Sequence, residues 1–287
     1  MRLTINPMTH QIDKKLQELD LKTESIEKIE KILSESILGH TRPTISTTFE
    51  GIFRARKITN ANDSEIDYIK SIWHPNWKEI SESEYRYNRC SDKGENFFYC
   101  SNSLETTIKE LEPENGDDIL IGIFYPKFAT TKVRCQFAGI EELRNNIHYK
   151  TVLKNYNYYS KNDKKIEELI SSKFKERVSK DESFKYKLTI AFSNILLKNK
   201  DIECLIYPSI ATKFEFVNFG LKPVFVDEHL YCAEIFQYSV EKTSNEYILT
   251  PEKYGEIEHN LQTPKISEID WKECRNEDKN IKKNFGL

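Results

Sequence analysis

The side chains with the clearest chemical potential lie between Arg89 and Glu110. The guanidinium of Arg89 is a planar fork of donors that suits a phosphate or pyrophosphate group. Tyr99 stands ten residues further on and supplies a ring that can stack on a flat heterocycle, and Glu110 follows eleven residues after it. A carboxylate at that place can hydrogen-bond a ribose hydroxyl or stabilise an oxocarbenium-like centre during glycosidic cleavage.

Two outlying segments complete this candidate set. Upstream, Arg54 and Arg56 alternate along a predicted strand, so both point toward one of its faces. Downstream, Ser209 follows Pro208 and offers a small donor and acceptor on a fixed turn. Taken in this order, the residues suit the binding of a dinucleotide and the cleavage of its N-glycosidic bond.

Each of these residues also has an ordinary structural explanation. Two arginines on one strand face usually meet solvent, and an arginine directed into a cleft is the functional alternative. A glutamate on a helix is usually solvated, and a Tyr-Pro-Ser turn is more often structural than chemical. The combination and order of the residues therefore carry more weight than any one of them.

Other kinds of chemistry have little support. There is no G-x-G-x-x-G and no P-loop, so hydride transfer and kinase chemistry lack a motif. No C-x-x-C pair occurs, and the six histidines stand at no ligand spacing from the six cysteines, so we expect no metal site. A net charge of −3 without a long basic run argues against a nucleic-acid partner, and the lack of a carboxylate cluster argues against a nuclease.

The expected site of action is the cytoplasm. Most cysteines lie in or beside apolar runs, as buried reduced thiols do. No signal peptide is visible, and no apolar run approaches the ~20 residues that span a bilayer, so no membrane partner is expected. Secretion by a specialised injection machine would leave no such mark, and delivery as an effector stays open.

The hydrophobic pattern predicts alternating blocks of helix and strand. The segment 217–227 is expected to turn, because it contains Asn218, Gly220 and Pro223. The segment 241–287 is polar and is expected to be a partly ordered wrap or a partner segment. The predicted elements are helices in 11–38 with a stop at Gly39, one strand in 46–58, a strand at 97–99, a helix capped by Ser103, strands in 117–128 and 130–140, helices in 141–199, and strands in 201–210 and 229–240.

The order of these motifs resembles the RES domain family, which takes its name from an arginine, a glutamate and a serine. The resemblance covers about residues 48–238. Where the family has Asn-Pro after its second arginine, this chain has Ser91-Asp92, and the insert 141–200 is long. The matching positions are Phe53-Arg54, Arg89, Gly94, Tyr99, Glu110, Tyr207-Pro208-Ser209 and Asn218 to Pro223.

The resemblance implies an α+β fold with an ADP-ribosyltransferase-like core of two small β-sheets that form a cleft flanked by helices. The implied catalytic domain is 46–240, preceded by an N-terminal helical extension in 1–45 and followed by a polar C-terminal extension in 241–287. The N-terminal helices are expected to pack on the main domain or to bind a partner.

The resemblance also implies an NAD-consuming enzyme, an NAD glycohydrolase or phosphorylase or an ADP-ribosyltransferase, with NAD as substrate and no metal. Members of the family are often bacterial toxins or effectors, so an antitoxin or immunity protein is an expected partner. The alternative is a catalytically inactive module on the same fold that binds a nucleotide or a partner. In the enzyme, Arg54 and Arg89 would bind the phosphates, Tyr99 would shape the nicotinamide pocket, Glu110 would hold the ribose and stabilise charge, and Ser209 and Asn218 would complete the pocket.

Overall fold

The structure, a computed structural model, describes residues 15–16, 18–37, 42–58, 64–75, 85–154, 156, 161–258, 267–275 and 283–286. The chain divides into two compact units, each made of separate stretches. Unit 1 contains residues 1–45, 76–95 and 134–210, and unit 2 contains residues 46–75, 96–133 and 211–287. The chain therefore passes between the units several times, a different division from the three consecutive segments that the sequence predicts.

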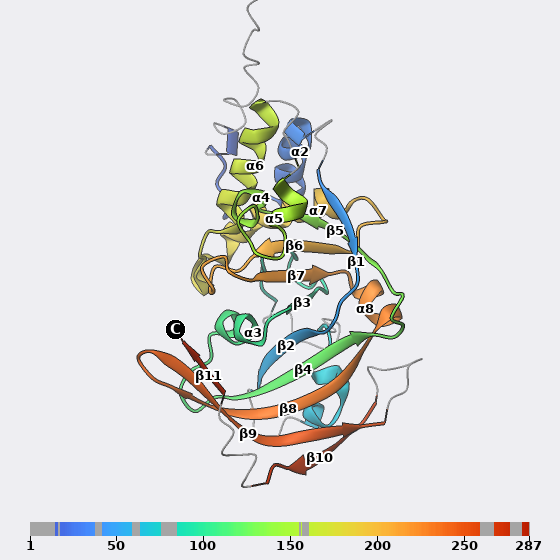
Figure 1. The fold of residues 1–287 in the computed structure, drawn as a ribbon. Coiled ribbons are helices and arrows are strands. Elements are labelled where there is room, and N and C mark those ends of the chain that lie inside the picture. The colour runs from blue at the N-terminus through green and yellow to red at the C-terminus, as the bar shows by residue number, and fades with distance from the viewer. Residues whose placement is uncertain are drawn as a thin grey trace, which may run out of the picture. The chain divides into compact units, whose positions relative to one another are not determined.

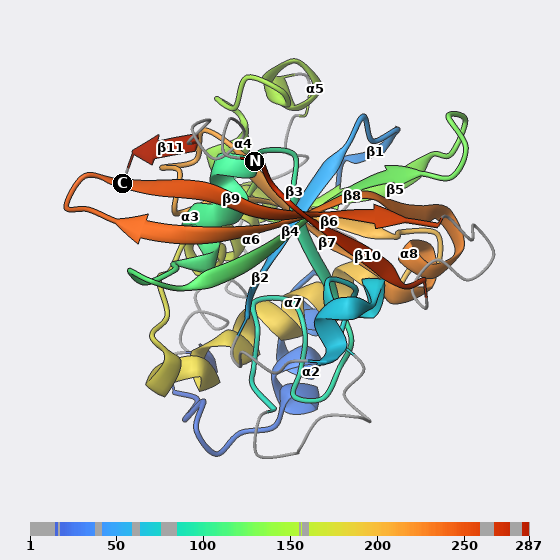
Figure 2. The ribbon, with the colours of Figure 1, turned by 90° about the horizontal axis from the view of Figure 1, so that it is seen from below.

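Unit 2 contains the antiparallel part of the sheet. Its strands follow the order β7-β3-β2-β4-β8-β9-β10, and β11 also pairs with β9. Figures 1 and 2 show β8 and β9 as a long hairpin beside β4. The strands are β2 (Ile52–Ile58), β3 (Phe98–Ser101), β4 (Asp118–Pro126), β7 (Val217–Leu221), β8 (Leu230–Lys242), β9 (Glu246–Ile257), β10 (Ile269–Glu273) and β11 (Lys283–Gly286), and the helices are η1 (Ser64–Asp67), η2 (Ile69–Ser71), α3 (Leu104–Leu111) and α8 (Pro223–His229).

The expectation of two small sheets forming a cleft is wrong. The eleven strands in the described residues belong to one open sheet with helices, not to two small sheets. The strands of the chain are of mixed direction, since β5 and β6 of unit 1 pair in parallel. Two segments that the sequence analysis did not count as strands account for much of the difference: 217–221 was expected to turn, and the polar segment 246–257 is a long strand.

The glycine at position 220 explains why the turn prediction failed. A Cβ at this position would lie 2.3 Å from Cε1 of Phe97, so Gly220 leaves room for an aromatic ring on the sheet. Its backbone does not adopt the left-handed conformation that a turn glycine often requires. Close packing, rather than turning, is the reason for a glycine here.

The two faces of this sheet carry different side chains. Residues opposite one another in antiparallel strands share a face, so the pairs Phe53–Ser101 and Ser101–Asn218 put these three side chains on the same side. Helix α3 packs on this face (Figure 1), where Ile108 joins a buried cluster. That cluster consists of Ile108, Ile119, Ile121, Tyr238, Val240, Tyr247 and Leu249. The opposite face carries Phe98 and Phe124, whose rings meet that of Trp73 from the segment after η2.

Unit 1 gathers most of the helices. Strands β5 and β6 pair in parallel, with Cys135 opposite Cys204. Helix α7 is buried along most of its length and packs against α2. The elements are α2 (Ile26–Ile37), β5 (Val133–Phe137), α4 (Ile140–Leu143), α5 (Lys150–Lys154), α6 (Lys161–Phe174), η5 (Lys180–Tyr186), α7 (Lys187–Leu197) and β6 (Cys204–Pro208). A further strand, β1 (Thr44–Thr47), lies where the chain passes from unit 1 to unit 2. The single strand expected in 46–58 is therefore two strands, separated by residues 48–51.

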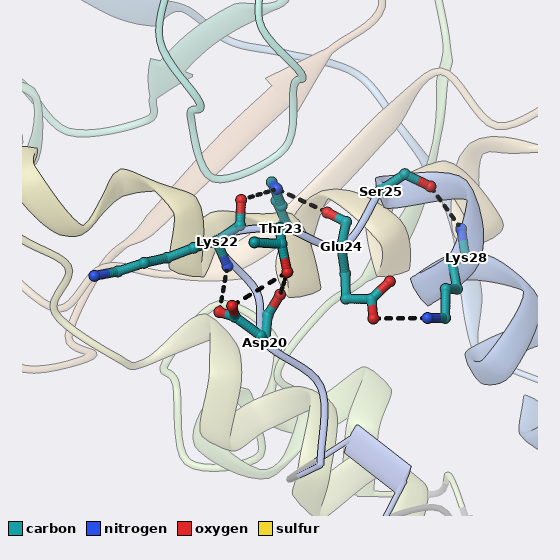
Figure 3. A network of polar contacts seen from close by, with 7 residues as sticks. Asp20, Lys22, Thr23, Glu24, Ser25 and Lys28 are labelled. Carbon is teal, nitrogen blue, oxygen red and sulfur yellow. Dashed lines mark hydrogen bonds and ion pairs between the residues drawn. The ribbon is translucent and has the colours of Figure 1, made fainter.

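The loop that leads into α2 is fixed by polar contacts (Figure 3). Asp20 accepts hydrogen bonds from the Lys22 amide and the Thr23 hydroxyl, and Lys28 forms an ion pair with Glu24 at 2.6 Å. From α7, the buried Lys187 Nζ donates to the carbonyl oxygens of Lys22 at 3.2 Å and Glu24 at 2.7 Å. The α2 segment is therefore an integral part of unit 1.

Two remaining predictions concern the ends of elements and the membrane. The stop expected at Gly39 lies outside the described residues, while α2 is described as far as Ile37. Among the residues that the structure describes, no helix combines the length and the apolar character needed to cross a bilayer.

Candidate functional site

Helix α3 places the candidate carboxylate. Strand β3 ends at Ser101, and Ser103 caps the helix, with its Oγ accepting a hydrogen bond from the Thr106 amide at 3.3 Å. The predicted cap is thus confirmed. The helix ends before Glu112, which adopts a left-handed conformation with φ of 48°. Glu110 therefore stands in the last turn, where its side chain is exposed.

Glu110 meets Asn218 across 108 positions of sequence. The Asn218 Nδ2 donates to Glu110 Oε1 at 2.8 Å. Asn218 is itself buried in β7, opposite Ser101, whose Oγ donates to the carbonyl of Val217 at 2.7 Å. The carboxylate is therefore held by an amide that the sheet keeps in place, while the rest of the glutamate side chain faces outward.

Tyr99 lies on the same face of the sheet. It is two residues before Ser101 in β3 and opposite Gly220 in β7. Its half-buried ring packs against Phe97, with ring centroids 5.3 Å apart and the planes tilted by 50°. Unit 2 thus gathers Tyr99, Glu110 and Asn218 on the side covered by α3.

Arg54 lies on the other face. It is next to Phe53 in β2, and successive residues of a strand point to opposite sides. Its Nε donates to the carbonyl of Ile72 at 2.9 Å and its Nη1 to that of Tyr99 at 2.8 Å, and the guanidinium lies 5.0 Å from the centre of the Phe98 ring. Burial lowers the pKa of Arg54 to about 10, so the side chain stays charged at neutral pH. The structure therefore does not bring Arg54 together with Glu110.

Arg89 belongs to unit 1, where it caps a helix. Its Nη1 donates at 2.7 Å to the carbonyl of Phe174, the last residue of α6, and both terminal nitrogens lie 3.4 Å from the carbonyl of Glu176. The guanidinium also lies over the Tyr186 ring at 5.3 Å. A cation at the carboxyl end of a helix is stabilising, which gives Arg89 a structural reason for its place.

Ser209 also belongs to unit 1 and is fully buried. It follows β6, whose last residue, Pro208, packs on Gly139. A Cβ on that glycine would lie 3.0 Å from Pro208 Cδ. The ring of Tyr207 meets that of Phe174 at 5.9 Å. The Tyr-Pro-Ser segment is thus part of the interior of unit 1.

One polar cluster in unit 2 was not found from the sequence. Asp227 Oδ1 accepts a hydrogen bond from Trp73 Nε1 at 2.6 Å and lies 2.9 Å from His74 Nε2, while the carbonyl of Asp227 accepts from Lys127 Nζ at 2.9 Å. The cluster ties α8 to the segment after η2 and to the end of β4. No sequence pattern links Trp73 to an aspartate 154 positions away.

Among the residues that the structure describes, no group of three or more histidine, cysteine, aspartate or glutamate side chains is arranged to hold a metal ion. No protein-family model matches the chain, and no curated protein matches it.

Proposed function

We propose that this protein is an NAD-consuming enzyme that cleaves the N-glycosidic bond between nicotinamide and ribose. The observation that supports this most directly is the 2.8 Å hydrogen bond from Asn218 Nδ2 to Glu110 Oε1. It joins two residues that the sequence analysis assigned to one pocket although they lie 108 positions apart. Tyr99 on the same face adds the aromatic surface that a flat leaving group requires.

The chemistry assigned to Glu110 is electrostatic. As the bond breaks, nicotinamide leaves with the bonding electrons and positive charge develops at the anomeric carbon. A carboxylate placed beside that carbon stabilises the transition state more than the ground state. Asn218 orients the carboxylate through one oxygen, and water, phosphate or a protein side chain completes the reaction by attacking the anomeric carbon.

Arg54 takes a different role in this proposal from the one expected. Its donors hold the carbonyls of Ile72 and Tyr99, so it positions β3 and with it the tyrosine. In a bacterial cytoplasm such an enzyme would act as a toxin or effector, and an antitoxin or immunity protein would be its natural partner.

A second candidate is a module that binds a nucleotide or a partner protein without turnover. The specific observation in its favour is that Arg54 and Arg89 both donate to main-chain carbonyls, while Ser209 is fully buried. Three of the six residues expected at the substrate thus have structural surroundings that explain their presence.

Incubation of the purified chain with NAD separates the two candidates. Mass spectrometry should detect free nicotinamide and a product containing ADP-ribose, and Glu110→Gln should slow nicotinamide release by about 100-fold or more. The matched control is Glu112→Gln, an exposed glutamate just beyond the end of the same helix, which should behave as wild type.

The enzyme assignment fails if wild-type protein releases no nicotinamide. If Glu110→Gln and wild type release nicotinamide at the same rate, Glu110 does not have the catalytic role assigned to it. Expression in a bacterial host gives a second readout, since the active enzyme should deplete cellular NAD and the inactive module should not.

A further inference from the structure

The first turn of α3 has main-chain donors without partners. The first four amide groups of a helix have no acceptor inside it. Here the Ser103 amide donates to Ser101 Oγ at 3.2 Å, and the Thr106 amide donates to Ser103 Oγ at 3.3 Å. No described residue accepts a hydrogen bond from the amides of Leu104 or Glu105. Two N–H groups thus remain at the positive end of the helix.

A buried hydroxyl at the same end also lacks a partner. Thr106 is fully buried, and its Oγ1 has no hydrogen bond within the described part of the chain. Its neighbour Thr107 differs, because its Oγ1 donates to the carbonyls of Ser103 at 2.9 Å and Phe53 at 3.3 Å. Thr106 is the third residue of α3 and so stands in its first turn, and side chains on a helix tilt toward its amino end.

Asn102 adds a second unpartnered group. Its Oδ1 is buried and has no hydrogen bond to any described residue. Turning the carboxamide by 180° exchanges oxygen and nitrogen, so the same position can present an N–H donor. Buried polar groups in proteins nearly always have partners, and two such groups at one helix terminus indicate a ligand that supplies them.

We propose that the first turn of α3 is a subsite for a phosphate group. The donors are the amides of Leu104 and Glu105, the Thr106 hydroxyl and the turned carboxamide of Asn102. A helix amino terminus combines free N–H groups with a positive dipole end, and both favour an anion. The Glu105 carboxylate is paired with Lys109 Nζ at 2.8 Å, which offsets its repulsion of an anion.

This subsite rests on and deepens the function proposed above, because it shows where the phosphates of a dinucleotide would bind when Arg54 and Arg89 hold carbonyl groups. Thr106 and Glu110 are four residues apart, so they share one side of α3 and are separated by about 6 Å along its axis. One helix would therefore offer donors for a phosphate at its start and a carboxylate for the neighbouring ribose at its end.

Calorimetric titration of the full chain with inorganic pyrophosphate tests the subsite without involving glycosidic cleavage. Thr106→Val removes the hydroxyl and keeps the shape of the side chain. We expect pyrophosphate affinity to fall about tenfold, since a hydrogen bond to a charged ligand is lost. The melting temperature should stay the same or rise, since a buried hydroxyl without a partner is removed.

Thr107→Val is the matched control and should behave in the opposite way. Its hydroxyl already bonds two carbonyls, so its loss should lower the melting temperature and leave pyrophosphate affinity unchanged. Asn102→Asp places a negative charge in the turn and should weaken pyrophosphate binding further than Thr106→Val does.

The subsite is refuted if wild type does not bind pyrophosphate, or if Thr106→Val binds it as tightly as wild type. Nicotinamide release measured on the same proteins tests the NAD-cleaving activity separately from the phosphate subsite. Pyrophosphate binding that depends on Thr106 without any NAD cleavage would support the subsite and reject the enzyme. NAD cleavage with unchanged pyrophosphate affinity in Thr106→Val would reject the subsite alone.

Discussion

At the scale of single residues, several arginines of this protein donate hydrogen bonds to main-chain carbonyl groups. Arg54 donates to Ile72 and Tyr99, Arg89 to Phe174, and Arg42 to Phe137. A guanidinium has five donors, so one side chain can satisfy carbonyls from separate segments. The residue type alone does not distinguish this use from phosphate binding, because both depend on the same planar fork.

Arg42 and Glu167 form the most deeply buried ion pair in the described part of the chain. Arg42 Nη1 lies 3.0 Å from Glu167 Oε1 and Nη2 donates to Oε2 at 3.0 Å, with exposed side-chain fractions of 3% and 0%. Glu167→Gln should destabilise unit 1 by about 3–5 kcal/mol, since it leaves the guanidinium buried without a counter-charge. Urea unfolding should show this loss, and the double variant Arg42→Met/Glu167→Leu should recover most of it. A single variant as stable as wild type would show that the pair contributes little.

At the scale of elements, local signals predicted well the pieces that depend on neighbouring residues. The helix after Ser103 begins at its predicted cap, because the capping bond joins residues only three apart. Strand β4 follows from a continuous apolar run, and helix α7 follows from apolar residues repeated along one helical stripe. The turn prediction for 217–221 was wrong because Gly220 makes room for the ring of Phe97, which is distant in sequence. No short-range pattern indicates that contact.

For the candidate site too, the sequence predicted some features correctly and others not. Glu110 and Asn218 do meet, but their contact depends on β3 lying between β2 and β7, which the residue order does not reveal. The face on which Arg54 lies follows from strand register, and a shift of one residue would reverse it. Order and spacing along the chain stay the same whichever face of the sheet a residue takes.

Gly255 shows how one residue controls the outer strands of unit 2. It lies in β9 opposite Ile235 of β8 and Trp271 of β10. A Cβ there would stand 2.3 Å from Cγ2 of Ile269 and 2.5 Å from Cγ2 of Ile235, so Gly255→Ala should cost about 1–3 kcal/mol through overpacking. The control is Gly286→Ala in β11, where an added Cβ meets nothing within 4 Å. Equal melting temperatures for the two variants would contradict this packing.

At the scale of the whole molecule, buried thiols are a feature of both units. Cys90 lies in unit 1, and Cys100 and Cys232 lie in unit 2. Burial raises the pKa of all three thiols, that of Cys90 from 9.0 to about 12, because a thiolate loses its hydration in the interior. The folded protein therefore binds these protons more tightly than the unfolded chain does.

This difference predicts a loss of stability in alkaline solution. Below pH 9 the thiols are protonated in both states and the stabilisation is complete. As the pH rises from 9 toward 12, the unfolded chain releases its protons first, so the free energy of unfolding should fall, by on the order of 1 kcal/mol for Cys90 at pH 10. Urea titrations at several pH values from 7 to 10 measure this slope. Cys90→Ala should make it shallower whatever its effect at pH 7, because the raised pKa of this thiol is then lost. An identical slope in wild type and Cys90→Ala would show that the Cys90 proton does not contribute.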